Sequence, residues 1–137
     1  MVNQEVIRKR LNKIDEYLVI LYKLQRYSFE DFLADPERYG SAERFLHLAI
    51  EAINDIGNHI IADDALGMVD SYRDIPTILA EKGIINQTQR EKWIRMIGFR
   101  NTLVHEYIEI DREIVYQVLR ENLADIEGLM QVFAKYL

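Results

Sequence analysis

The sequence is poor in the residues that would cross-link, break or loosen a chain. It has no cysteine, and therefore no disulfide, no thiolate nucleophile and no thiolate ligand for zinc. Its two prolines and six glycines are spread thinly, so no linker and no low-complexity segment is visible. No apolar run approaches the roughly 18 residues of a membrane span, and no secretory signal is visible at the N-terminus. These absences lead us to expect a soluble, cytoplasmic protein that has no contact with a membrane.

Length and charge narrow the class of protein further. A chain of 137 residues that is 49% hydrophobic is expected to form a single domain over residues 1–137, with a sizeable core. The net charge of −6 argues against broad, non-specific nucleic-acid binding, which needs a basic field. A small local cleft of arginines and lysines remains compatible with it. The basic cluster Arg8, Lys9, Arg10 and Lys13 is interpreted as a solvated helix face, with RNA contact as the alternative.

Hydrophobic residues recur at helical spacing along most of the chain, and no β pattern of any length appears. The predicted helices span about residues 3–26, 29–34, 41–62, 75–81, 88–107 and 111 to the C-terminus. Ser28 with Asp31 and Thr88 with Glu91 are predicted N-terminal capping pairs, and Asp111 is the predicted cap of the last helix. The pattern predicts an all-α, antiparallel helical bundle with three or four long helices plus short ones.

One segment breaks the hydrophobic pattern. In the helix predicted for residues 88–107, Arg100 and Tyr107 lie about 20° apart in the middle of the apolar stripe. Asn101 and His105, four residues apart, stack on the flank of the same stripe. A guanidinium on a core-facing stripe is costly unless it is paired or faces a cavity or a partner. Four polar groups that break the pattern together indicate a site.

These side chains suit metal-independent cleavage of a phosphodiester. An imidazole would act on the RNA 2′-hydroxyl or on the leaving oxygen, and a guanidinium would stabilise the developing charge. Asn101 would orient the imidazole of His105 or bind a phosphate oxygen. The structural alternative pairs Arg100 with a core carboxylate, for which Glu43 and Asp55 are the candidates, and leaves His105 as a helix-end histidine.

The segment Arg100-Asn101-Thr102-Leu103-Val104-His105-Glu106-Tyr107 resembles the Arg-x4-His-x-Tyr signature of HEPN-domain proteins of the HepT toxin type. The preceding Gly98-Phe99 and the segments 43–51 and 55–59 are also similar to that family. The resemblance covers about residues 6–133, nearly the whole chain.

The resemblance implies a HEPN-like homodimer in which the signature helices of two subunits meet at a shared cleft. It implies a metal-independent ribonuclease toxin, with no cofactor of its own, that cleaves an RNA such as a tRNA or an mRNA with Arg100 and His105. It also implies a minimal nucleotidyltransferase antitoxin as partner, which transfers AMP from ATP to Tyr107. Two alternatives stay open: a non-catalytic subunit that binds a nucleotide or a partner nucleotidyltransferase, and a purely structural helical dimer.

Overall fold

The computed structural model describes residues 1–105 and 109–137 of the chain. These residues form seven α-helices and no β-strand, which confirms the predicted all-α fold, although the sequence predicted six helices. The helices are α1 (Gln4–Gln25), α2 (Phe29–Ala34), α3 (Pro36–Asp63), α4 (Asp74–Glu81), α5 (Gln87–His105), α6 (Arg112–Glu121) and α7 (Leu123–Ala134).

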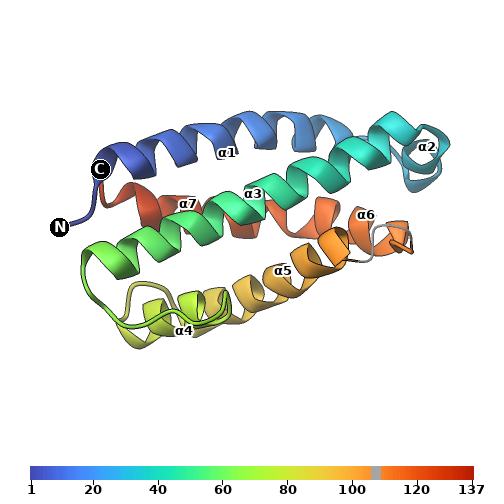
Figure 1. Ribbon diagram of the computed structural model, residues 1–137. Coiled ribbons are helices and arrows are strands. Elements are labelled where there is room, and N and C mark those ends of the chain that lie inside the picture. The colour runs from blue at the N-terminus through green and yellow to red at the C-terminus, as the bar shows by residue number, and fades with distance from the viewer. Residues whose placement is uncertain (106–108) are drawn as a thin grey trace.

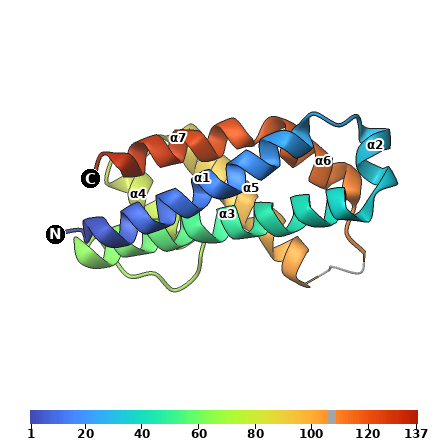
Figure 2. The ribbon, with the colours of Figure 1, turned by 90° about the horizontal axis from the view of Figure 1, so that it is seen from above.

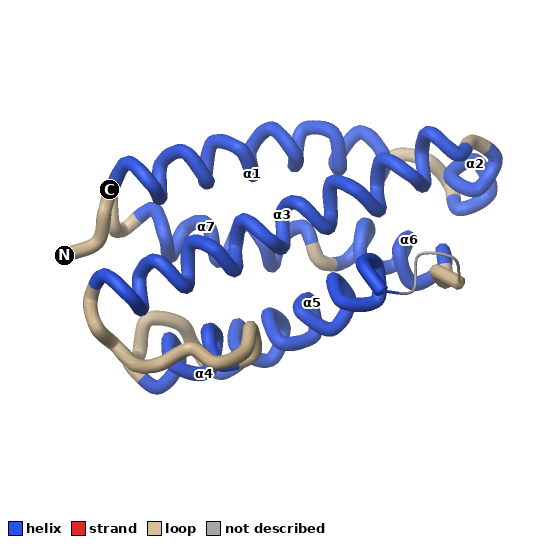
Figure 3. The backbone as a smooth tube through the Cα atoms, in the orientation of Figure 1, coloured by secondary structure: helices blue, strands red, loops and turns tan. Residues whose placement is uncertain are grey.

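The four long rods of the bundle alternate in direction. Figure 1 shows α1 and α5 running one way and α3 running back between them, while α6 and α7 return toward the end at which both termini lie. The predicted antiparallel helical bundle is therefore confirmed. Figure 3 shows that the connections gather mainly at the two ends of the bundle, and that the longest of them joins α3 to α4.

Side-chain caps explain where several helices begin. The Ser28 hydroxyl accepts a hydrogen bond from the Asp31 backbone N–H at 3.1 Å, and the Asp111 carboxylate accepts one from the Glu113 N–H at 2.9 Å. Both caps confirm the sequence predictions. Such a cap satisfies a backbone donor that has no partner within the helix, and it contributes about 1 kcal/mol.

Three predicted boundaries were wrong. Helix α3 begins at Pro36 instead of residue 41, because Asp35 caps it and a proline is well tolerated at the first helical position. Helix α5 begins at Gln87, and its capping pair is Asn86 with Gln89 in place of Thr88 with Glu91. The last predicted helix is broken at Asn122.

The break between α6 and α7 has a local cause. Asn122 donates a side-chain hydrogen bond to Asp125 at 2.9 Å and is the C-cap residue of α6, with φ −110° and ψ −2°. Asparagine is a weak helix former because its side chain competes for backbone groups. The break does not interrupt the hydrophobic face, since Leu119 and Leu123 on either side of it are both buried.

Helix α3 is the central element of the fold. It packs against each of the other six described helices, and one hydrophobic core cluster draws residues from all seven. At Gly57 the helices approach closely: an added Cβ atom would lie 2.6 Å from Ile75 Cγ2 and 2.7 Å from Trp93 Cη2. Gly57 is therefore a point of close helix approach, where a residue without a side chain is required.

Seen from above, the C-terminal part of α5 and the connection between α3 and α4 both emerge on the side of α3 that faces away from α1 (Figure 2). This side of the molecule carries the residues of the predicted site. Among the helices of the described residues, none is long and apolar enough to cross a membrane.

Candidate active site

Arg100 lies near the end of α5 and turns its guanidinium toward α3. Its side chain is only 14% exposed, and Nη2 forms an ion pair with Oε1 of Glu51 on α3. Nη1 donates a longer hydrogen bond, 3.2 Å, to Oδ1 of the neighbouring Asn101. Nε is buried and has no hydrogen-bond partner among the described residues. The guanidinium is thus fixed at the edge of the core, and its buried Nε donor is still unused.

The carboxylate that pairs with Arg100 differs from the two that the sequence suggested. Glu43 lies farther toward the start of α3, where burial raises its pKa and Arg112 opposes that shift. Asp55 is exposed and lies 3.5 Å from Arg10 of α1. The suggestion that Glu43 or Asp55 pairs with Arg100 was wrong, because the rotation of α3 presents Glu51 to α5 instead.

His47 lies on α3, one turn before Glu51, and forms a small cluster of ionisable side chains with Glu51 and Arg100. Its Nε2 is 3.8 Å from the Glu51 carboxylate and has no hydrogen-bond partner among the described residues. Burial lowers the pKa of His47, and the nearby charges of Arg100 and Arg44 act in the same direction, whereas Glu51 opposes them. Because its ordinary pKa is about 6.5, His47 is neutral in the folded protein at neutral pH.

Tyr72, from the connection between α3 and α4, lies beside the same guanidinium. The Arg100 Cζ atom is 5.3 Å from the centroid of the Tyr72 ring, within the range of a cation–π contact. The sequence offered no sign of this contact, because Tyr72 is an isolated aromatic residue in a predicted connection.

Asn101 and His105 lie on the outer side of α5, and both are exposed. His105 is the last residue of that helix. Five residues of α-helix separate Arg100 from His105, which places their side chains about 140° apart around the axis. The guanidinium and the imidazole of one chain therefore do not share a face. Tyr107, the predicted modification site, lies outside the described residues.

The basic cluster of α1 is largely neutralised by neighbours, as the interpretation of a solvated face requires. Arg8 pairs with Glu5, and Lys13 with Glu16 at 3.2 Å. Lys9, Arg10 and Lys13 nevertheless line a shallow groove of about 300 Å³ that also includes Glu51. RNA contact along this groove stays a prediction. Within the described part of the chain, no group of three or more histidine and carboxylate side chains is placed to hold a metal ion.

The fold and this arrangement define a class of protein: a HEPN-type helical bundle with a polar site at the end of one helix. Among solved structures, the tri-AMPylated HEPN toxin of Shewanella oneidensis in complex with MNT antitoxin matches with a TM-score of 0.89. The match covers 97% of this chain and 99% of that one, at 28% sequence identity.

Sequence comparison is more specific than the fold. Residues 7–133 match the HepT-like family of ribonucleases. The mRNA nuclease HepT of Shewanella oneidensis is 38% identical over 87 residues, which is 64% of this chain and 65% of that protein. The tRNA nuclease HepT of Aphanizomenon flos-aquae is 32% identical over 96% of this chain and 90% of its own length. This chain therefore belongs to the HepT-like ribonuclease family, and the resemblance found in the sequence is confirmed.

Proposed function

We propose that the protein is a ribonuclease toxin of a HEPN/minimal nucleotidyltransferase toxin–antitoxin pair. The proposal rests on its membership of the HepT-like family and on one observation: Arg100 is held at the core edge by Glu51 while His105 stands exposed at the end of the same helix. Relatives named as an mRNA nuclease and a tRNA nuclease support RNA as the substrate class.

The reaction needs no cofactor beyond the protein's own side chains. The imidazole of a His105 takes the proton of the RNA 2′-hydroxyl, and the 2′ oxygen attacks the adjacent phosphorus. The bond from phosphorus to the 5′ oxygen breaks, and this oxygen takes a proton from a second imidazolium or from water. The products are a 2′,3′-cyclic phosphate and a 5′-hydroxyl end. Arg100 stabilises the charge on the phosphate oxygens, and Asn101 positions Arg100 or the phosphate.

The site is shared between two copies of the chain. Within one chain Arg100 and His105 point about 140° apart, so a single phosphate is reached by both only if a second copy supplies one of them. Two α5 helices related by a two-fold axis would frame the RNA between them, as a symmetric interface presents the same patch twice.

The nucleotidyltransferase partner neutralises the toxin by transferring AMP from ATP to Tyr107. An adenylate on Tyr107, which follows Arg100 by seven positions in the sequence, would add bulk and negative charge to the segment that carries the proposed site. It would occupy the guanidinium and exclude an RNA phosphate. The AMPylated Shewanella toxin supports this part of the proposal. A cytoplasmic location remains the prediction made from the sequence.

A second candidate function is a non-catalytic subunit of a nucleotidyltransferase complex. The ion pair between Arg100 and Glu51 favours it, since a guanidinium that is already neutralised binds a phosphate less strongly. The two functions differ in whether the purified protein cleaves RNA.

The deciding experiment measures RNA cleavage by the wild type and by Arg100→Ala, His105→Ala and the control Arg95→Ala, which alters an exposed arginine of the same helix. We expect cleavage to persist in EDTA, to be lost in the first two variants and to be retained in the control. Equal cleavage by all four proteins would rule out the proposed site. No cleavage by the wild type, with retained binding to the nucleotidyltransferase, would favour the second function.

A mixing experiment tests whether the site is shared. Arg100→Ala and His105→Ala chains, unfolded and refolded together, form mixed dimers in which one copy supplies Arg100 and the other His105. At random pairing, recovery of at most about a quarter of the wild-type activity is expected. No recovery from a mixture that does form dimers would place both groups in one chain.

A further inference from the structure

A second hollow lies beside the proposed site. It has a volume of about 440 Å³ and opens between α3 and the connection from α3 to α4. Its lining consists of Asn54, Asp55, Asn58, Val69, Asp70, Ser71, Tyr72 and Ile75. The volume falls within the range of small-molecule sites, about 300–1,000 Å³.

Asn54 is the residue that gives this hollow a chemical preference. It is only 1% exposed, and its Oδ1 accepts a hydrogen bond from Trp93 Nε1 at 2.7 Å. An indole nitrogen can only donate, so this bond fixes which end of the amide is oxygen. The Nδ2 amino group is then left buried, with no hydrogen-bond partner among the described residues. A buried donor without a partner is unusual in a native protein and calls for an acceptor.

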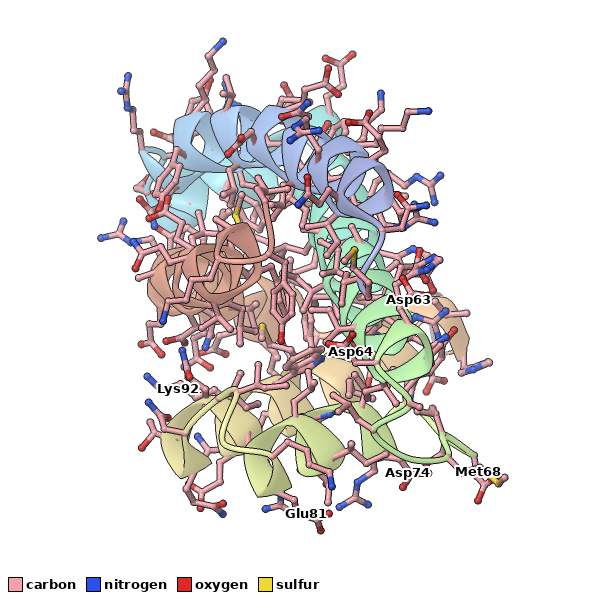
Figure 4. The ribbon with its side chains drawn as sticks, turned by 90° about the vertical axis from the view of Figure 1, so that its left-hand side faces the viewer. Asp63, Asp64, Met68, Asp74, Glu81 and Lys92 are labelled. Carbon is pink, nitrogen blue, oxygen red and sulfur yellow. The ribbon has the colours of Figure 1, made fainter. Side chains whose placement is uncertain are left out.

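The opposite wall of the hollow is held in place by hydrogen bonds. The carboxylate of Asp74 accepts bonds from the backbone N–H groups of Asp70 and Ser71 at 2.9 and 3.0 Å. Figure 4 shows Asp74 at the base of this connection and Met68 at its outer tip, with the Met68 side chain pointing away from the helices. The side chains of Asp70 and Ser71 thus face a space whose backbone frame is fixed.

The lining favours a neutral, planar ligand over a phosphate. Among the described residues that line it there is no lysine or arginine, whereas there are two carboxylates: Asp70, which would repel an anion, and Asp55, which lies 3.5 Å from Arg10 of α1. Tyr72 offers an aromatic face for stacking, and Val69 and Ile75 offer apolar contacts. A nucleobase has this combination of a flat apolar face and a hydrogen-bonding edge.

The available hydrogen-bonding groups narrow the choice of base. Asn54 contributes one buried donor without a partner, and the carboxylates contribute only acceptors, whereas Asn58 and Ser71 can each donate or accept and so do not select a base. Guanine and uracil carry a carbonyl oxygen next to a ring N–H, so both groups on that edge find a complement here. Adenine and cytosine carry an amino group next to an unprotonated ring nitrogen, so the donor and the acceptor on their edges are exchanged relative to guanine and uracil. The hollow also adjoins the proposed phosphate site, since the Tyr72 ring contacts Arg100, and Glu51 precedes Asp55 by one turn of α3.

We propose that this hollow binds one keto base of the RNA, guanine or uracil, beside the phosphate at Arg100. Asn54 donates to the carbonyl oxygen, a carboxylate of Asp55 or Asp70 accepts from the ring N–H, and Tyr72 stacks on the base. This inference rests on the proposed ribonuclease function, and it assigns the base preference of that site.

The test uses the only tryptophan in the chain as its reporter. The indole N–H of Trp93 is bonded to Asn54, so its single signal in a ¹⁵N-correlated NMR spectrum senses the hollow directly. Wild-type protein is titrated with GMP, UMP, AMP and CMP up to millimolar concentrations. We expect the signal to move with GMP, UMP or both, and to stay in place with AMP and CMP. The separate GMP and UMP titrations show which of the two keto bases fits.

Variants separate base recognition from general binding. Asn54→Asp keeps an acceptor for Trp93 but replaces the donor by an oxygen, so it should shift the preference toward AMP and CMP. Tyr72→Ala should weaken GMP or UMP binding about tenfold, while Tyr72→Phe retains it. Tyr72 is exposed, so its variants are expected to fold even if the buried substitution does not. Met68→Ala, on the same connection but outside the hollow, is the matched control.

The readout does not depend on catalysis. If the wild type fails to cleave RNA yet GMP or UMP moves the Trp93 signal, the proposed ribonuclease function fails while the base site stands. An unmoved signal with every nucleotide would mean that the hollow holds only water, and equal movement with all four would mean that it does not select a base. Either result overturns the proposal.

Discussion

The close helix approach at Gly57 allows a sharp test of how the core is built. Gly57 on α3 faces Ile75 of α4 and Trp93 of α5, and a Cβ atom at this position would lie 2.6 Å and 2.7 Å from their side-chain carbons. Both neighbours are at most 1% exposed, so neither can move aside into solvent. The perturbation is therefore Gly57→Ala, the smallest change that adds a Cβ.

Two opposing effects determine how much Gly57→Ala changes the free energy of unfolding. Alanine is a better helix former than glycine by about 1 kcal/mol. Extra volume forced into a packed core costs about 1–3 kcal/mol, and contacts this short with two buried side chains place the cost in the upper part of that range. The net effect of Gly57→Ala is a loss of about 1–2 kcal/mol in the free energy of unfolding, which lowers Tm by several degrees.

Gly40 provides the matched control on the same helix. No described atom lies within 4 Å of the position that its Cβ would take, apart from the local backbone. Gly40→Ala therefore gains the better helix propensity of alanine without the cost of overpacking, and it should raise the free energy of unfolding by about 1 kcal/mol. The same substitution in one helix is thus expected to have opposite signs at two positions.

Urea unfolding measures both values, at one protein concentration, because association of subunits would add to apparent stability. The indole signal of Trp93 should move in Gly57→Ala and stay in place in Gly40→Ala. If Gly57→Ala proved as stable as the parent, or more stable, α3, α4 and α5 would not be in the close contact described here.

Three further predictions concern charge, pH and capping. Glu51→Gln, made in a cleavage-deficient His105→Ala protein, removes the carboxylate that neutralises Arg100 and should therefore tighten RNA binding. The slope of log K against log salt concentration should become steeper by about 0.7, as expected for one more phosphate contact. Fluorescence anisotropy at several salt concentrations measures both quantities. Because burial lowers the pKa of His47 in the folded state, the stability it contributes is present above about pH 6.5 and is lost as the pH falls through the lower folded value. Urea unfolding at about pH 7.5 and about pH 5.5 should therefore show a smaller pH dependence for His47→Asn than for the parent. Asn86→Ala removes the cap of α5 and should cost about 1 kcal/mol, whereas Thr88→Ala should cost much less.

Helical periodicity was sufficient to predict the bundle, but it did not predict where every helix begins and ends. The apolar spacing of α1 and the cap at Ser28 were read correctly, because both are local signals. The predicted helices 29–34 and 41–62 leave out residues 35–40, although Pro36 suits the first position of a helix and begins α3. The break at Asn122 leaves the hydrophobic face continuous, so periodicity predicts one helix where there are two.

The sequence predicted where the candidate site lies, but it did not predict which residues contact each other there. The position of Arg100 on an apolar stripe is visible in the sequence, and it does point inward. Its partner Glu51 could not be chosen from several acidic residues of α3, because that choice depends on how two helices are rotated against each other. Asn54 is a polar residue of an amphipathic helix, yet it is buried, because α3 packs against six other helices.

The seam between α3 and α5 explains why Arg100 had to break the pattern. Gly57, Asn54 and Glu51 are spaced three residues apart along α3. Gly57 and Asn54 both face Trp93 of α5, whereas Glu51 pairs with Arg100, which follows Trp93 by two turns of α5. The contacts change along this antiparallel seam from close apolar packing to a buried hydrogen bond and then to an ion pair whose Glu51 side chain is 36% exposed. In the proposed site, Arg100 would contact the core on one side and a phosphate on the other, and a long side chain with several donors can do both. The register set by Gly57 and Trp93 therefore also positions the guanidinium, so a substitution that displaces α5 at Gly57 should lower RNA cleavage more than its loss of stability alone would.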